Sequence, residues 1–222
     1  MALGLLAKLI MTKQLRFEDG QVELKDVNIT LVPSFFISEL TRYFYDAKKM
    51  PRLYLLSWIW SHKFCGEVSR QFNLDTPSKV YNFGMELLEA MGIGLYKTYD
   101  YYPQRYTHFS ISNNPYLQYL SDIKSSEPID YFISGLMAGG GCFVHGQLTQ
   151  NVELKCKACG DEICDFLTGT EQELKNRGLW EIAVKRYNLE EIYPTQKEFY
   201  EAFQKKQDSE VMEDIIEKTL KI

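Results

Sequence analysis

The sequence predicts an α+β fold in which an antiparallel sheet is packed with helices. Two stretches, residues 95–112 and 152–166, alternate apolar and polar residues on both sides of a turn, which is typical of antiparallel hairpins. Residues 129–137 instead carry apolar side chains at positions i, i+3, i+4, i+7 and i+8, the spacing of one helix face. The 222 residues, 45% hydrophobic and 14% aromatic, are enough for one well-filled domain with a helical appendage.

The charge balance argues against two kinds of partner. The net charge is −5 and no long run of Lys or Arg occurs, so we expect neither nucleic acid nor a membrane surface as a partner. The first thirteen residues are mildly apolar, but Lys8 interrupts them and no cleavage site follows. They therefore predict a first helix or a partner-binding helix rather than a signal peptide or a membrane span.

The N-terminal third predicts a hairpin followed by three helices. Asp19-Gly20 is a turn dipeptide between two alternating runs within residues 14–32. The helices are expected over residues 33–48, 52–72 and 76–91, each starting beside a proline. The second of them is apolar on more than one face, which predicts either a helix buried between other elements or a helix that lines a pocket.

The remainder predicts two tyrosine-rich strands within residues 95–112, a short helix over 116–123, and a longer helix that starts at Pro128. Gly139, Gly140 and Gly141 either stop that longer helix or let another backbone approach it closely. From Glu171 the chain is charged and helical, and a final helical region is expected after Pro194, holding Phe199, Phe203, Val211, Ile215 and Leu220. We divide the chain into an α+β domain, residues 1–168, and a C-terminal helical extension, residues 169–222.

Chemistry is concentrated in residues 152–166, where three of the five cysteines occur. Cys156 and Cys159 form a CxxC pair, Cys164 follows a turn at Gly160-Asp161, and Glu153 precedes the first cysteine by three residues. Thiolates and carboxylates are zinc ligands, so the stretch predicts a metal site on a hairpin. Such cysteine spacing also suits a reducing cytoplasm better than a disulfide framework.

Strand geometry leaves the ligand set open. Glu153 and Cys156 are an odd number of residues apart, so an extended strand would point them to opposite faces unless a bulge intervenes. The alternative set is Cys156, Cys159 and Cys164, completed by His145, Cys142 or a carboxylate. These cysteines could also simply be small buried apolar residues.

The pattern E-x-x-C-x-A-x-G-D-x-x-C, formed here by residues 153–164, resembles the 4-vinyl reductase domain family. The resemblance implies an antiparallel sheet packed with helices around a small-molecule pocket, often in a dimer. Its fold is shared with subunits of the TRAPP vesicle-tethering complex and with nitric oxide sensing domains. Some members are the aromatic-sensing half of bacterial transcription activators. The specific part of the resemblance covers residues 135–166.

The resemblance also implies a ligand set. In the aromatic sensors a structural zinc is held by the Glu and two Cys of this motif, which correspond to Glu153, Cys156 and Cys164, and by a Cys 23 residues before the Glu. That fourth position is Asp130 here, so either Asp130 or Cys159 replaces the thiolate, or the site is altered. The ligand pocket is expected beside the zinc. From the order of the expected elements alone, we place its walls at Trp58, Trp60, Tyr96, His108 and Phe132.

Three functions follow from these observations. The first is a cytoplasmic, zinc-stabilised domain that binds or senses a small apolar or aromatic molecule, as a homodimer. The second is a non-catalytic adaptor, which a filled core without a cavity would favour. The third is an enzyme or accessory protein of tetrapyrrole metabolism, although no nicotinamide or flavin fingerprint is present and a family name does not confer chemistry.

Overall fold

The computed structural model describes residues 2–18, 21–205 and 213–217, and it contains two antiparallel sheets and helices packed around them. The larger sheet has the strand order β4-β5-β7-β6, with β4 at Leu95–Tyr102, β5 at Tyr106–Ser112, β6 at Thr149–Lys155 and β7 at Cys164–Thr170. Both hairpins expected from the alternating residues are therefore confirmed. The smaller sheet contains β1 (Leu15–Glu18), β2 (Gln21–Leu24) and β3 (Val27–Ile29). The expected turn at Asp19-Gly20 lies outside the described residues, although Glu18 pairs with Gln21 beside it.

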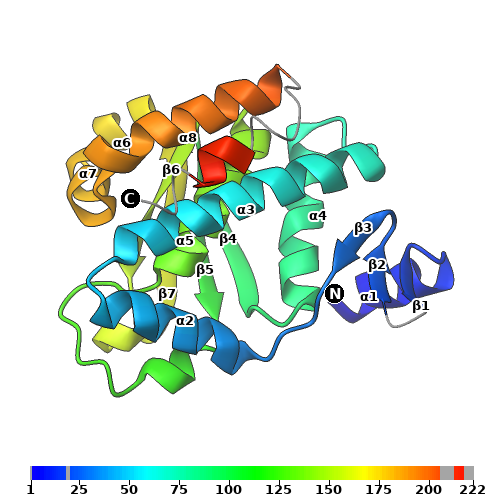
Figure 1. Cartoon of the computed structure of the whole chain (residues 1–222), viewed down its shortest axis with the longest axis horizontal. Helices are drawn as coiled ribbons and strands as arrows, with labels where there is room; N and C mark the ends of the chain where they lie inside the picture. The colour runs from blue at the N-terminus through cyan, green and yellow to red at the C-terminus, as the bar shows by residue number, and fades with distance from the viewer. Residues whose placement is uncertain (1, 19–20, 206–212, 218–222) are drawn as a thin grey trace.

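The helices cover the larger sheet in layers (Figure 1). Helix α5 (Tyr131–His145) lies against β6 and β7, and the long helix α3 (Met50–Gln71) packs along α5. Helix α4 (Pro77–Ala90) contacts α5 and β4, while α1 (Ala2–Met11) packs on α4 and α2 (Ser34–Asp46) on α3. The C-terminal helices are α6 (Glu171–Asn176), α7 (Trp180–Tyr187) and α8 (Leu189–Gln204), which contact β6, β7 and α3.

Two glycines in α5, Gly135 and Gly139, explain how closely α3 and α5 approach. The helix continues through Gly139, Gly140 and Gly141 to His145, so the glycines do not stop it. A Cβ atom added at Gly139 would lie 2.1 Å from the carbonyl oxygen of Trp58, and one at Gly135 would lie 2.2 Å from that of Tyr54. Only glycine permits this contact between two helix backbones. The close-approach alternative is therefore the one that the structure confirms.

One boundary predicted from the sequence is wrong. Pro194 does not separate two helical regions but lies inside α8. Its side chain is exposed, while Ile192, Gln196 and Phe199 on the opposite face are buried against the rest of the protein. These tertiary contacts hold the helix together across the one backbone hydrogen bond that proline cannot donate. Of the residues expected after Pro194, Val211 and Leu220 lie outside the described residues.

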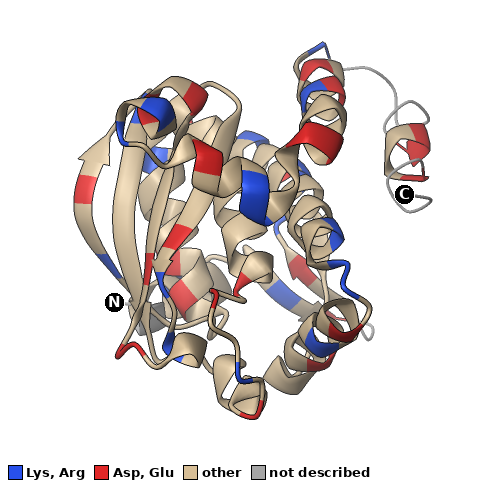
Figure 2. Cartoon of the chain, turned by 90° about the vertical axis from the view of Figure 1, so that its left-hand side faces the viewer, with Lys and Arg blue, Asp and Glu red and all other residues tan. Residues whose placement is uncertain are grey.

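The surface carries charges of both signs. Figure 2 shows Lys and Arg interspersed with Asp and Glu over the visible elements, without a continuous basic stripe. Within the described ranges, no helix is both long enough and apolar enough to cross a membrane.

Candidate functional site

A bulge in β6 brings Glu153 and Cys156, on the β6 side of the β6–β7 hairpin, close to Cys164 at the start of β7. The register between β6 and β7 shifts between Glu153 and Lys155, so the strand gains one residue there. The shift turns Glu153 and Cys156 to the same side, which removes the parity objection raised by a regular strand. Ligand atoms of Glu153, Cys156 and Cys164 all lie within 4.8 Å of one another, and the three residues are buried.

The turn that follows Cys156 is built for this arrangement. A short 3-10 helix, Lys157–Cys159, ends at Gly160, whose φ of 101° favours glycine. The Asp161 carboxylate accepts a hydrogen bond from the Cys156 backbone N–H at 2.8 Å, and the Lys157 N–H donates to the Cys164 sulfur at 3.4 Å. The turn thus fixes both cysteines by backbone contacts before any ion binds.

The buried side chains of Glu153, Cys156 and Cys164 all carry acidic groups, and these groups lie next to one another. Burial raises the pKa of Glu153 well above its usual range, and the neighbouring Asp130 carboxyl group raises it further. A hydrogen bond from Cys164 lowers the pKa of Cys156 to about 5, whereas that same contact, followed by burial, raises the pKa of Cys164. Within the described part of the chain, Oε1 of Glu153 has no hydrogen-bond partner. Sulfur and carboxylate donors at this spacing, with one buried oxygen left unpaired, fit a zinc ion.

Asp130 lies beside this group but is engaged differently. Its backbone N–H donates to Oε2 of Glu153 at 3.1 Å, and its carboxylate caps the first turn of α5 by accepting from the Ile133 N–H at 3.2 Å. Asn114 and Tyr116 donate to the same carboxylate. Burial raises the pKa of Asp130 to about 7.

The other candidate ligands are less well placed. Cys159 lies near Cys156 but is half-buried and outside the converging group, and burial raises its pKa to about 12. His145 and Cys142 lie at the far end of α5, roughly 20 Å along the helix axis from Asp130. There His145 contacts Thr107 and Cys142 contacts Thr149, so neither completes the group.

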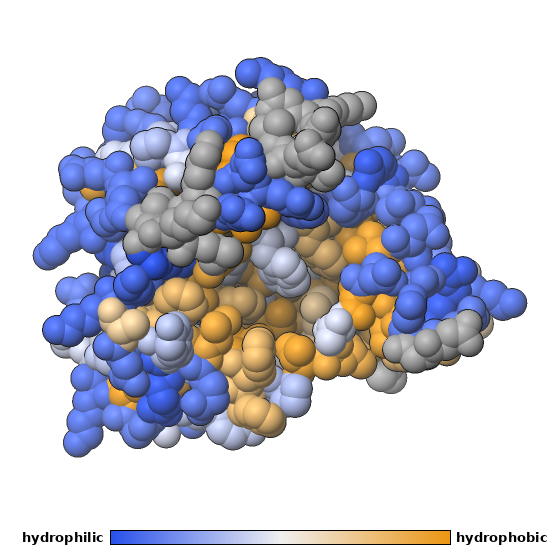
Figure 3. All heavy atoms as spheres, in the orientation of Figure 1, coloured by the Kyte–Doolittle hydropathy of each residue, from blue (hydrophilic) through white to orange (hydrophobic). Residues whose placement is uncertain are grey.

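A cavity of about 80 Å³ lies between α3, α4, α5 and the sheet. Its walls are almost entirely apolar and include Phe64, Leu87, Phe109, Leu136, Met137 and Val144. Figure 3 shows apolar side chains gathered on the face of the molecule between α2, α3 and α4, where the surface is hollowed. Trp60 and Met91, both partly exposed, belong to the lining.

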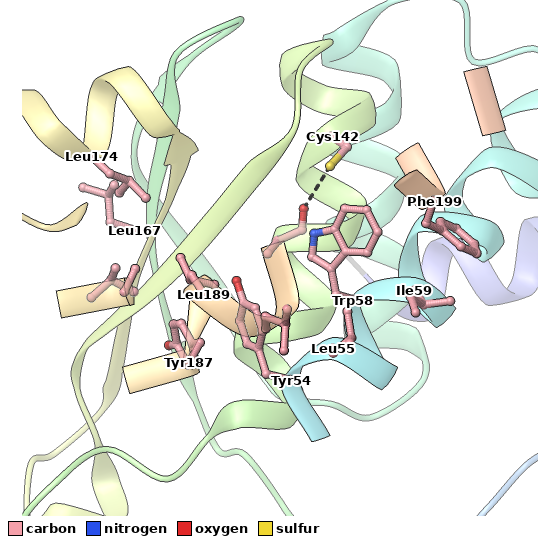
Figure 4. Packing of buried hydrophobic residues seen from close by; sticks show 14 of the residues in the cluster. Tyr54, Leu55, Trp58, Ile59, Cys142, Leu167, Leu174, Tyr187, Leu189 and Phe199 are labelled. Carbon is pink, nitrogen blue, oxygen red and sulfur yellow. Dashed lines mark hydrogen bonds between the residues drawn. The ribbon is translucent and has the colours of Figure 1, made fainter. Parts of the chain in front are cut away.

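Of the five residues expected to form the pocket, Trp60 lines this cavity, and the other four lie elsewhere. Trp58 points away from it, stacks on His62 and packs beside Phe199 in the core (Figure 4). Because Trp58 and Trp60 are two residues apart on one helix, they cannot share a face. The helix is therefore both a core helix and a pocket helix, which the sequence left as alternatives.

The remaining three residues that we expected in the pocket lie elsewhere in the structure. His108 lies on the opposite face of the sheet, with Nε2 2.8 Å from the Asp165 carboxylate. Tyr96 packs near Phe109, and Phe132 packs near Tyr116. Both belong to the part of the hydrophobic core that also contains the buried cysteines of the hairpin. The lining residues that sequence reasoning missed come largely from α4, where Val80, Phe83, Leu87 and Leu88 already form a visible apolar stripe.

The cysteine group and the cavity are joined by two elements. Helix α5 starts at Asp130, beside Glu153, and its later turns supply Leu136, Met137 and Val144 to the cavity. Strand β7 starts at Cys164 and supplies Thr168 to the cavity wall. The two places therefore share α5 and β7 as common structural elements.

Comparison with known proteins defines the fold. Among solved structures, the chain is similar to the crystal structure of the phenol-responsive sensory domain of the transcription activator PoxR with phenol. The TM-score is 0.62 at 16% sequence identity, and the match covers 79% of this chain and 94% of that chain. No family model matches the chain, and no curated protein matches it. The predicted α+β class is thus confirmed, and the chain has the fold of a sensory ligand-binding domain.

Proposed function

We propose that this chain is a small-molecule sensing domain that holds an apolar or aromatic ligand in the cavity between α3, α4, α5 and the sheet. The observation that carries this proposal is the cavity itself, which is lined by aromatic and aliphatic side chains and has the partly exposed Trp60 in its wall. A largely preformed apolar cavity is the usual form of a small-molecule site. The fold shared with a phenol-responsive sensory domain supports it. A filled core would have favoured the adaptor alternative.

We further propose that a structural zinc ion binds at Glu153, Cys156 and Cys164. The converging ligand atoms and the unpaired, buried Oε1 of Glu153 support this assignment. As the fourth ligand we favour Asp130, whose carboxyl group interacts electrostatically with both cysteines, over the half-exposed Cys159. When bound, the ion would fasten the β6–β7 turn to the start of α5 and so hold one end of the cavity wall.

The proposal includes an assignment of the domains. The cavity and the cysteine group use residues from within 60–168, so we assign ligand and metal binding to the α+β domain, residues 1–168. Within the extension, residues 169–222, helices α6 and α7 then serve to cover the sheet beside β6 and β7. Membership of the 4-vinyl reductase domain family, a homodimeric state and a cytoplasmic, non-catalytic role belong to the same proposal, and they rest on the motif, the charge balance and the cysteine usage.

A cavity-filling variant tests the ligand proposal. Gly84 lines the cavity, and a Cβ atom added there would meet no atom within 4 Å, so Gly84→Leu can enter the space without a clash. Leucine also favours a helix over glycine by about 1 kcal/mol, so α4 should still fold. We expect titration calorimetry with benzene, toluene and phenol to detect binding of at least one compound to the unmodified protein and at least a tenfold loss in Gly84→Leu.

A matched control is Gly4→Leu, the same change in α1 at a position that also has no neighbour within 4 Å and does not line the cavity. Its affinity should equal that of the unmodified protein. Binding by none of the three compounds, or equal binding by Gly84→Leu, would argue against the cavity as a ligand site and favour the adaptor.

A further inference from the structure

The walls of the cavity offer a ligand almost no hydrogen-bonding group. Three of the walls are the helices α3, α4 and α5, whose internal N–H and C=O groups bond to one another along each helix. The apolar side chains that face the space come from these helices, from Leu74 and Met91 just outside the ends of α4, and from Phe109 of β5. A ligand in the cavity therefore meets side-chain carbon and sulfur rather than backbone polar groups.

Most polar side chains in the wall are already paired with the protein. Thr107 contacts Nε2 of His145 at 3.2 Å, and the hydroxyl group of Thr168 accepts a hydrogen bond from Asn151 at 2.8 Å. The hydroxyl group of Tyr81 is 2.5 Å from that of Thr98. A ligand hydroxyl group could bond to these atoms only by competing with an existing partner.

Two polar atoms of the lining residues have no partner within the described ranges, and both are covered. They are Nδ1 of His145 and the hydroxyl oxygen of Ser69. Neighbouring atoms shield both from any solvent-sized space, so neither faces the cavity as it stands. Use of His145 as an anchor for a hydroxyl group would require its ring to turn away from Thr107.

From this lining we propose that the cavity selects a single-ring aromatic hydrocarbon, such as benzene or toluene, over phenol. The inference rests on the proposed function and specifies its ligand class. Toluene and phenol have nearly the same shape, but the phenol hydroxyl group loses its hydrogen bonds to water on entry and gains none in return. The volume of about 80 Å³ is smaller than the apolar cavity of about 150 Å³ that is known to hold benzene, so a single ring already requires the wall to open at the partly exposed Trp60, and a two-ring ligand would require a much larger opening.

The decisive measurement is the ratio of the dissociation constants of phenol and toluene for the full chain, obtained by titration calorimetry. A hydrophobic pocket disfavours an isostere with an added hydroxyl group by about 10- to 100-fold, so we expect toluene to bind tighter by that factor. Equal affinity, or tighter binding of phenol, would overturn the hydrocarbon preference while leaving the sensing function intact. Binding of neither compound would instead contradict the proposed function.

Variants of three lining residues, His145, Met137 and Met85, examine the physical cause. His145→Phe, made together with Thr107→Val so that the Thr107 hydroxyl group is not left unpaired in the wall, removes a ring that could turn to meet a ligand hydroxyl group, and the ratio should stay within about threefold of the original. A selective loss of phenol binding in this double variant would show that the His145–Thr107 pair is a hydroxyl anchor and would overturn the proposal.

Met137→Gln places an amide of similar length in the wall and should shift the ratio toward phenol by about tenfold. Met85→Gln makes the same change at a half-buried lining position, where the cost to folding is smaller. An unchanged ratio in both folded variants would show that hydrogen bonding does not set the selectivity.

Discussion

Helix α5 connects two regions of different chemistry. Its N-terminus lies beside a group of buried acidic side chains, and its later turns line the apolar cavity. The first region holds Glu153, Cys156 and Cys164, whose ligand atoms converge within 4.8 Å. The second is the cavity of about 80 Å³. The two regions thus offer different chemistry, because one gathers sulfur and carboxyl groups that can act as metal ligands and the other is lined by apolar side chains.

The two regions also differ in how they are specified. The cysteine group comes from a single hairpin, within twelve residues of sequence, and its donor types and their spacing are enough to suggest zinc. The cavity is assembled from α3, α4, α5, β5 and β7, and none of its lining residues is unusual in itself. Four predictions bear on this comparison, and we take them from the largest expected effect to the smallest.

Removal of one thiol should affect the metal region most. Cys156→Ser should lose the proposed zinc ion and about 5 kcal/mol or more of unfolding free energy, because metal-binding energy is also folding energy. Metal content by mass spectrometry and denaturant unfolding measure both quantities. The control is Cys159→Ser in the same turn, which should keep the metal. Zinc retained by Cys156→Ser, or lost equally from both variants, would contradict the ligand set.

A change in the shared helix should disturb both regions together. Gly139→Ala would place a Cβ atom 2.1 Å from the Trp58 carbonyl oxygen and should cost about 3 kcal/mol, because two helix backbones must move apart. We expect lower ligand affinity and lower metal affinity in the same variant.

The matched control for that change is Gly140→Ala. Its added Cβ would lie 3.1 Å from the Cys65 sulfur, and a side chain can yield more easily than a backbone. Its cost, measured by thermal unfolding, should stay below about 1 kcal/mol. Equal stability of the two variants would mean that the α3–α5 contact is loose enough to accept a side chain.

Acid should also lower the free energy of unfolding through His62, which lies in the aromatic core behind the cavity and outside both regions. Burial of His62 among Trp58, Phe143 and Phe199 lowers its pKa to about 4 from an ordinary 6.5. The unfolded state therefore takes up a proton at higher pH than the folded state does. The stability that neutral His62 contributes is complete above about pH 6.5 and is lost as the pH falls toward 4, on the order of 3 kcal/mol in all.

His62→Phe tests this, since a phenylalanine ring suits the aromatic surroundings and does not titrate. Unfolding free energies measured from pH 7 to pH 4 should fall less in the variant by about that amount. Zinc content followed over the same range separates this loss from protonation of the cysteine ligands. An identical acid sensitivity in both proteins would show that His62 is already protonated, or hydrated, in the native state.

The smallest effect on stability is expected at the partly exposed tryptophan of the cavity wall. Trp60 is 45% exposed, so Trp60→Ala should change the unfolding free energy by no more than about 1 kcal/mol while it weakens ligand binding about tenfold. Trp58, which is fully buried, should show the reverse, with about 3 to 5 kcal/mol lost in Trp58→Ala. Ligand affinity that is unchanged in Trp60→Ala would place the ligand elsewhere.

Much of the secondary structure could be predicted, because the signals are local. The stripe at residues 129–137, the alternation at 152–166 and the prolines at 33, 51 and 77 lie at or within two residues of elements that the structure contains. The helix boundary predicted at Pro194 was wrong because the exposed position of Pro194 and the buried face of α8 depend on neighbours that are distant in sequence.

The sequence by itself determined the α+β class and the residue types of the metal-type hairpin, because periodicity and donor spacing act within a few residues. Only the tertiary structure decided that a bulge unites Glu153 with Cys156, that Trp60 rather than Trp58 faces a cavity, and that Gly135 and Gly139 let α3 and α5 touch. These outcomes depend on strand register, helix phase and the distance between backbones. Each of these quantities is set by contacts between segments that the sequence does not place side by side.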